Sequence, residues 1–145
     1  MAEHNGIHLE YIIDNNDFAA AGEASSKVKK LLTMLGVTPA VIKKVAIAMY
    51  EAEINAFIHG GGGVATIDIS TEKVNISIED HGKGIPDLEL AMQEGFSTAS
   101  EEVRMMGFGA GMGLPNINRN VDTLDIETAP GKGTKVKMTI AIPKT

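Results

Sequence analysis

The sequence predicts an α/β fold, a two-layer sandwich in which helices cover one face of a mostly antiparallel, mixed sheet. Segments that alternate apolar and polar residues occur in pairs joined by short turns, which is typical of antiparallel hairpins. Two longer segments, 18–35 and 39–59, carry apolar residues at helical spacing. The 145 residues contain no internal repeat and no low-complexity linker, so residues 1–145 are predicted to form one domain.

The first predicted strand and helix occupy the first 36 residues. Residues 8–13 alternate in the manner of a half-buried strand. Asp17 is a suitable N-cap for the helix that follows, because its carboxylate can accept a hydrogen bond from a free first-turn N–H. Apolar residues then recur at helical spacing as far as Gly36, which is a favourable residue for ending a helix.

A second helix is predicted from Pro39 to about His59. Thr38 and Pro39 are favourable as its N-cap and first helical residue. Residues 45–50 are apolar almost all round, so we expect this helix to lie in the core. The four glycines 60–63 end it and lead into a strand.

Two hairpins supply the rest of the predicted sheet. In the first, isoleucine and valine alternate with polar residues, so each of its strands buries one face. Between the hairpins we expect two helices separated by a mobile loop over residues 95–112. The strands predicted after the glycines are 64–70, 73–79, 124–128 and 134–142. The helices predicted between the two hairpins are 87–94 and 114–121.

The composition excludes several function classes. The net charge is −6 and aromatic residues make up 4% of the chain, so we expect no direct nucleic-acid binding. The absence of cysteine removes disulfides and thiolate metal sites. No apolar run approaches about 18 residues, so we expect no membrane span. The start of the chain lacks the pattern of an export signal, which favours a cytoplasmic protein.

Glu51 and Asn55 are the first candidate site residues. They are four residues apart on the second helix and therefore share one face. An amide oxygen at Asn55 suits Mg²⁺, and a carboxylate one turn earlier can take a proton from a hydroxyl or a water. The alternative is a pair of solvated polar residues. Glu53 points to another face, where we expect an ordinary surface residue.

Asp80 is the second candidate. It ends a predicted strand, and an ionised carboxylate there can accept a hydrogen bond from an exocyclic amine such as that of adenine. Gly82 and Gly84 follow it and allow backbone and ligand to approach closely. The alternative is a common turn at the end of a strand.

A glycine-rich segment precedes the helix predicted at 114–121. Backbone amides in such a loop can cradle phosphate, with help from the N-terminus of the helix. Arg104 stands before the loop, where its guanidinium can reach a terminal phosphate or remain solvated. The spacing fits neither the dinucleotide-binding fingerprint nor the P-loop. The candidate phosphate-binding residues are Gly107, Gly109, Gly111 and Gly113.

Taken together, these motifs resemble the N, G1, G2 and G3 boxes of the GHKL, or Bergerat-fold, ATPases, which include gyrase, Hsp90 and histidine kinases. The size and spacing are most similar to the small anti-sigma and switch serine kinases of bacterial partner-switching modules. The resemblance spans Leu9 to Ile142. The four motifs are Glu51-x-x-x-Asn55, Asp80-x-Gly82-x-Gly84, the glycine loop 107–113 and Gly131-x-Gly133-Thr134.

The resemblance implies ATP and Mg²⁺ as cofactors and assigns a role to each motif. It implies that Glu51 is the general base on a substrate serine and that Asn55 holds Mg²⁺. It further implies that Asp80 binds the adenine amine, Gly84 packs against the base, and Thr134 supports the adenine pocket. The phosphate contacts that it implies are Gly109, Gly111 and Gly113.

The resemblance also implies partners. The substrate of such a kinase is a small STAS-domain antagonist protein, and anti-sigma members also bind a sigma factor and form homodimers. Residues 109–115 are similar to the switch kinases, whereas residues 101–104 resemble the lid of the sigma binders. The alternative function is a non-catalytic, nucleotide-gated module that sequesters a regulatory partner. A free-standing ATPase and a histidine autokinase fit the chain less well.

Overall fold

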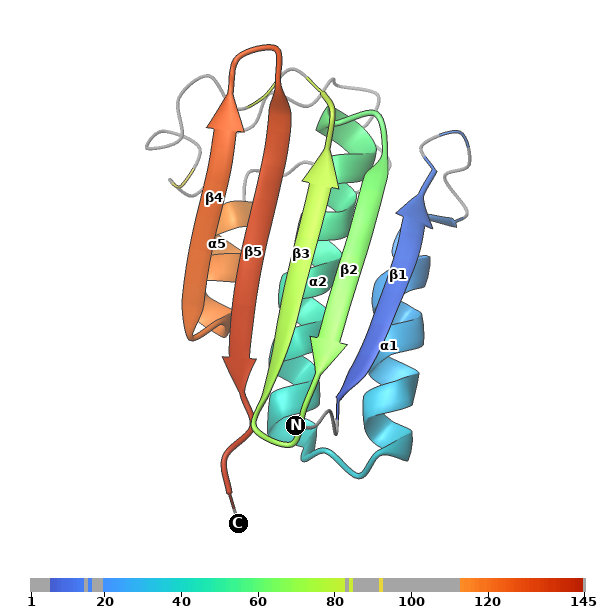
Figure 1. The fold of residues 1–145 in the computed structure, drawn as a ribbon, viewed down its shortest axis with the longest axis vertical. Coiled ribbons are helices and arrows are strands. Elements are labelled where there is room, and N and C mark those ends of the chain that lie inside the picture. Colours follow the sequence, from blue (N-terminus) through green and yellow to red (C-terminus); the bar gives the residue numbers. More distant parts are fainter. Residues whose placement is uncertain are drawn as a thin grey trace.

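The computed structural model describes residues 6–14, 16, 20–82, 84, 92 and 113–144. In these residues an open five-stranded sheet forms one layer, and the helices form a second layer on one of its faces (Figure 1). The prediction of a two-layer α/β fold is confirmed. The described strands and helices are β1 (Ile7–Ile13), α1 (Glu23–Met34), α2 (Pro39–His59), β2 (Gly63–Ile69), β3 (Lys73–Asp80), α5 (Gly113–Asn120), β4 (Thr123–Ala129) and β5 (Gly133–Ala141).

The sheet has the strand order β1-β2-β3-β5-β4. The sheet was predicted to be mostly antiparallel, and each of the four pairings in the described part of the chain is antiparallel. Both predicted hairpins are present, with strand ends within one or two residues of the expected positions. The helix predicted at 87–94 and the loop 95–112 lie outside the described residues, apart from residue 92.

The core lies between the sheet and the helices. Ile67 on β2 pairs with Ile76 on β3, which in turn pairs with Met138 on β5, and none of the three is more than 2% exposed. Met49 of α2 belongs to the same buried cluster. The alternating pattern of the hairpins therefore turns one row of side chains towards α2, as the sequence predicted. None of the described helices has the length and apolar character that crossing a bilayer requires.

The start of α1 differs from the prediction. The helix begins at Glu23 with Gly22 as its N-cap, so the assignment of the N-cap to Asp17 is wrong; Asp17 itself lies outside the described residues. Thr38 and Pro39 begin α2 as predicted, although the Thr38 side chain makes no capping hydrogen bond. Gly22 has no side chain with which to cap α1, so the cap must come from elsewhere in the fold.

The prediction that Glu53 is a surface residue is also wrong. Its side chain is only 2% exposed and lies between α2 and the first turn of α1. The carboxylate accepts hydrogen bonds from the backbone N–H groups of Ala24 and Ser25. The side chain is buried because it replaces the cap that Gly22 lacks.

We expect the core to depend strongly on the side chains that α1 contributes. Leu32 is completely buried, so Leu32→Ala should lower the free energy of unfolding by about 2–5 kcal/mol through lost burial and a cavity. Leu35 ends the same helix and is 47% exposed, so Leu35→Ala should change it by only about 0.5 kcal/mol. Urea unfolding of both variants measures the difference, and equal losses would contradict this placement of the core.

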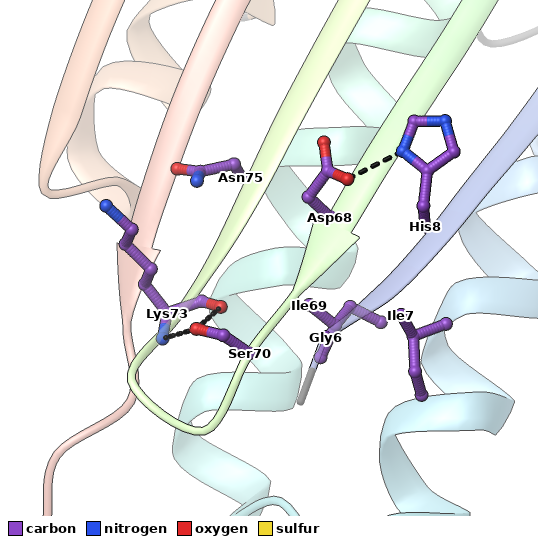
Figure 2. Close-up of a pocket in the computed structure, with 8 residues that line it drawn as sticks. All are labelled: Gly6, Ile7, His8, Asp68, Ile69, Ser70, Lys73 and Asn75. Carbon is purple, nitrogen blue, oxygen red and sulfur yellow. Dashed lines mark hydrogen bonds and ion pairs between the residues drawn. The ribbon is translucent and has the colours of Figure 1, made fainter. Parts of the chain in front are cut away.

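The face of the sheet opposite the helices carries mostly polar side chains. A shallow pocket of about 260 Å³ opens between β1, β2 and β3 (Figure 2). It lies near Lys73, where β3 begins, and therefore at the other end of that strand from Asp80. On its wall, His8 Nδ1 lies 2.6 Å from Asp68 Oδ1, and His8 Nε2 lies 3.3 Å from Glu10 Oε2. The hydrogen bond to Asp68, followed by that to Glu10, raises the pKa of His8 above its usual value of 6.5.

The interaction between His8 and Asp68 is expected to contribute to stability in a pH-dependent way. Because the pKa of His8 is raised in the folded state, the pair stabilises the fold below pH 6.5, and this contribution is lost as the pH rises through the folded-state pKa. In Asp68→Asn the His8 pKa should fall towards its usual value, as an NMR titration of the ring protons would measure. An unchanged His8 titration in that variant would rule out the ion pair as the cause.

Candidate functional site

Asp80 stands where β3 ends, as predicted. Its Oδ1 accepts hydrogen bonds from the backbone N–H of Gly82 at 2.9 Å and of Thr134 at 3.2 Å. These bonds tie the end of β3 to the start of β5 and fix the orientation of the half-buried carboxylate. Among the described residues no hydrogen bond reaches Oδ2. That oxygen is an oriented acceptor for a donor such as an exocyclic amine.

Close backbone contacts hold this corner of the site together. Gly84 has a φ of +80°, and a β-carbon there would collide with the carbonyl of Ala129. Gly133 has a φ of +83°, and its β-carbon would lie 2.9 Å from the Cα of His81. Any other residue at either position would both strain the backbone and push the segments apart. The two glycines therefore allow the chain after Asp80 to lie against the β4–β5 turn.

Thr134 lies in the same corner and is 8% exposed. Its hydroxyl is 3.0 Å from that of Thr128, which donates to the carbonyl of Gly133 at 3.2 Å. Because the single Thr128 hydrogen is used in that bond, the Thr134 hydroxyl donates to Thr128. The structure thus brings four predicted site residues into one cluster: Asp80, Gly82, Gly84 and Thr134.

Glu51 lies on the face of α2 that packs against α5. Its Oε2 accepts a hydrogen bond of 3.0 Å from Nδ2 of Asn116 on α5. Arg119 donates a hydrogen bond of 3.1 Å to Oδ1 of Asn116. With that oxygen held by Arg119, the NH₂ group of Asn116 faces Glu51. The half-buried carboxylate is therefore held in one orientation. Sequence reasoning missed Asn116, and its place three residues after Gly113 on a predicted helix was the available signal.

Asn55 lies one turn after Glu51 and faces the start of α5. A β-carbon added at Gly113 would be 3.1 Å from the amide nitrogen and oxygen of Asn55, so the Asn55 side chain occupies the space where a side chain at position 113 would lie. The first turn of α5 begins here in the described part of the chain, and its N–H groups have no carbonyl partner within the described helix. An amide oxygen beside a helix N-terminus suits a cation that bridges to an anionic group.

The two halves of the site meet along the last turns of α2. Gly60 follows that helix, and a β-carbon there would lie 2.6 Å from Oδ2 of Asp80. Asn55 is five residues earlier, or about 7.5 Å along the helix axis. The remaining predicted residues, Arg104, Gly107, Gly109 and Gly111, lie outside the described residues.

The donor set of the described residues fits a nucleotide together with its magnesium ion. No group of three or more His, Cys, Asp or Glu side chains gathers there as a metal cage. Mg²⁺ in nucleotide sites needs only one or two protein ligands, because phosphate and water oxygens complete its octahedron. Asn55 can provide such a ligand, and Oδ2 of Asp80 can accept from adenine.

Residues 40–144 match the model of a protein family described as histidine kinase-, DNA gyrase B- and HSP90-like ATPases. The chain belongs to this family. These are the GHKL ATPases that the sequence motifs resemble, and the domain is accordingly an ATP-binding one. The matched segment contains all but the first residue of α2 and the whole Asp80 cluster.

The curated relatives of this GHKL ATPase are small regulatory proteins. It is 40% identical over 121 residues to an anti-sigma F factor of Thermoanaerobacter sp. (strain X514), covering 80% of this chain and 81% of that protein. It is 39% identical over 146 residues to the anti-sigma F factor of Caldanaerobacter subterraneus subsp. tengcongensis, covering 96% of this chain and 95% of that protein. It is 30% identical over 125 residues to the serine/threonine-protein kinase RsbT of Bacillus subtilis, covering 83% of this chain and 86% of that protein.

Solved structures share the fold of this GHKL ATPase. The RsbU and RsbW domains of a Mycobacterium tuberculosis protein match 96% of this chain with a TM-score of 0.63 and 18% identity. This chain spans 33% of that longer structure. The mycobacterial sensor histidine kinase MprB matches 96% of this chain with a TM-score of 0.53 and 16% identity. At these identities the likeness establishes the fold alone.

Proposed function

We propose that this GHKL ATPase is a Mg²⁺-dependent serine kinase that phosphorylates a small STAS-domain protein. The observation that carries the proposal is the Glu51 carboxylate, which is oriented by Asn116 one helical turn before Asn55. A fixed carboxylate next to a magnesium-type ligand is the arrangement that transfer to a hydroxyl requires. Relatives named as anti-sigma F factors and as a serine/threonine-protein kinase support the same class.

The residues divide the work between binding and transfer. ATP bound with Mg²⁺ supplies the phosphoryl group and the cation that neutralises its charge. Asp80 accepts from the adenine amine through Oδ2, while Thr134 and Gly84 shape the pocket around the base. Asn55 holds the cation with its amide oxygen. Glu51 accepts the proton of the substrate serine hydroxyl, and its hydrogen bond to Asn116 keeps the carboxylate aimed at that position.

The partners of the proposed kinase follow from its relatives. Three curated relatives from different bacteria are named anti-sigma F factor, which supports a sigma factor as a second partner of this chain. A homodimer is part of the same proposal. The same names also favour a second candidate function, a nucleotide-gated module that sequesters the sigma factor without phosphorylating any protein.

One labelling experiment separates the two candidates. The purified chain, labelled ATP and Mg²⁺ are added to a lysate of its source cells, with Glu51→Gln as the matched control. A labelled small protein that appears only with the wild-type chain would support the kinase, and mass spectrometry would then test whether it is a phosphoserine-containing STAS protein. Tight ATP binding without any labelled protein would favour the sequestering module.

A further inference from the structure

The buried carboxylate of Glu53 has no part in the proposed transfer. Its Oε2 accepts from the Ala24 N–H at 3.1 Å and its Oε1 from the Ser25 N–H at 2.9 Å. Both donors belong to the first turn of α1, where backbone N–H groups have no partner within their own helix. The cap of α1 is thus supplied by a different helix, 28 and 29 residues further along the chain.

The surroundings of Glu53 leave little freedom to that contact. Gly22 contributes no capping side chain, and a β-carbon there would lie 2.7 Å from Cε1 of the Tyr50 ring on α2. Among the described residues no cation forms an ion pair with Glu53. The two N–H groups and the positive end of α1 compensate the buried charge. Breaking either hydrogen bond would leave a buried charge poorly solvated, which carries a high free-energy cost.

The position of Glu53 on α2 connects this contact to the candidate site. An α-helix advances about 100° per residue, so Glu53, two residues from both Glu51 and Asn55, lies about 160° around the axis from each of them. Glu53 therefore meets α1 on one side of α2, while Glu51 and Asn55 meet α5 on the other. On each of these two sides a carboxylate of α2 accepts hydrogen bonds from the neighbouring helix.

We infer that Glu53 is a positioning residue, which sets the rotation of α2 about its axis by its two hydrogen bonds to α1 and so aims Glu51 and Asn55 at α5. Position 22 itself cannot supply a capping side chain, because a β-carbon there would meet the Tyr50 ring in a backbone conformation that favours glycine, so the two N–H groups depend on Glu53. The buried carboxylate makes both hydrogen bonds in only one arrangement of α1 and α2. The inference rests on the proposed kinase function for its effect on transfer, but its effect on geometry stands apart from that function.

The test compares Glu53→Gln with Glu23→Gln. Glutamine keeps the shape of Glu53 but has one acceptor oxygen for two N–H groups. Glu23 lies in the first turn of α1 with a side chain that is 58% exposed, so its variant removes the same charge from the same helix end without touching the buried contact. We expect Glu53→Gln to lower kcat by about ten- to a hundredfold with an ATP KM within about threefold of wild type. Glu23→Gln should match wild type in both.

Two further readouts separate positioning from a loss of folded protein. Rates are measured well below the unfolding midpoint of each variant, where a purely structural defect would leave kcat of the folded fraction unchanged. The side-chain amide signal of Asn116 in an NMR spectrum reports the bond to Glu51, and it should shift in Glu53→Gln but not in Glu23→Gln. An unchanged Asn116 signal together with an unchanged kcat would overturn the inference. If the wild-type chain transfers no phosphate, the Asn116 signal alone decides.

Hydrogen exchange of the wild-type chain keeps the inference testable even if Glu53→Gln does not fold. First-turn amides normally exchange quickly because they lack a partner within the helix. If Glu53 joins α1 and α2 into one unit, the amides of Ala24 and Ser25 should exchange as slowly as those in the buried part of α2. Exchange at the rate of free first-turn amides would overturn the inference.

Discussion

Glu51→Gln is expected to lower the rate of phosphoryl transfer by about 10²–10⁴-fold, the usual contribution of a general base. The carboxamide has the same shape, and its oxygen can still accept the hydrogen bond from Asn116. It cannot take a proton from the substrate hydroxyl, because a neutral amide is a very weak base. Nucleotide binding should be retained, since the proposed adenine contact belongs to Asp80 and the proposed magnesium contact to Asn55.

The measurement combines calorimetric titration with ATP analogues and single-turnover phosphoryl transfer from ATP to the unphosphorylated partner protein. Glu79→Gln is the matched control, because Glu79 is an exposed carboxylate on β3 that points away from the helices. A Glu51→Gln variant that transfers at the wild-type rate would remove Glu51 from the mechanism. Loss of ATP binding in that variant would instead place Glu51 in the binding site.

Asp80→Asn is expected to reverse the preference for the purine base. Two backbone N–H groups occupy Oδ1 of Asp80, so the amide oxygen of the variant must take that place and its NH₂ group the place of Oδ2. A donor would then face the donor amine of adenine. We expect the affinity for ATP to fall by about ten- to a hundredfold, the equivalent of one lost hydrogen bond to a charged group. A 6-oxopurine nucleotide such as ITP presents an acceptor at that position and should bind the variant better than ATP does.

Affinities of ATP and ITP for both proteins test this expectation. Asp125→Asn removes an exposed carboxylate from β4 and should leave both affinities unchanged. Urea unfolding of Asp80→Asn should show a stable fold, because both backbone hydrogen bonds persist. Equal loss of ATP and ITP binding would argue against recognition of the base by Oδ2.

Local patterns in the sequence were enough to predict the strands, the helices and the chemistry of the side chains that they carry. Alternating residues at 64–70 and 73–79 specify a hairpin with one buried face, because side chains alternate across a strand. The four-residue spacing of Glu51 and Asn55 places both on one side of a helix, and glycines mark the positions where segments approach closely. These are short-range properties, so the order of strands and helices and the candidate motifs could be predicted.

The side chains that orient the site could be identified only in the folded protein. The Asn116–Glu51 bond joins residues 65 apart in the chain, and the Thr134–Asp80 bond joins residues 54 apart. Glu53 has the sequence signature of a solvated residue, because an acidic side chain on a helix is usually exposed. It is buried only because α1 begins at a glycine that cannot cap itself and presents its free N–H groups to α2. Such a pairing depends on the packing of two helices, which no local pattern in either segment encodes.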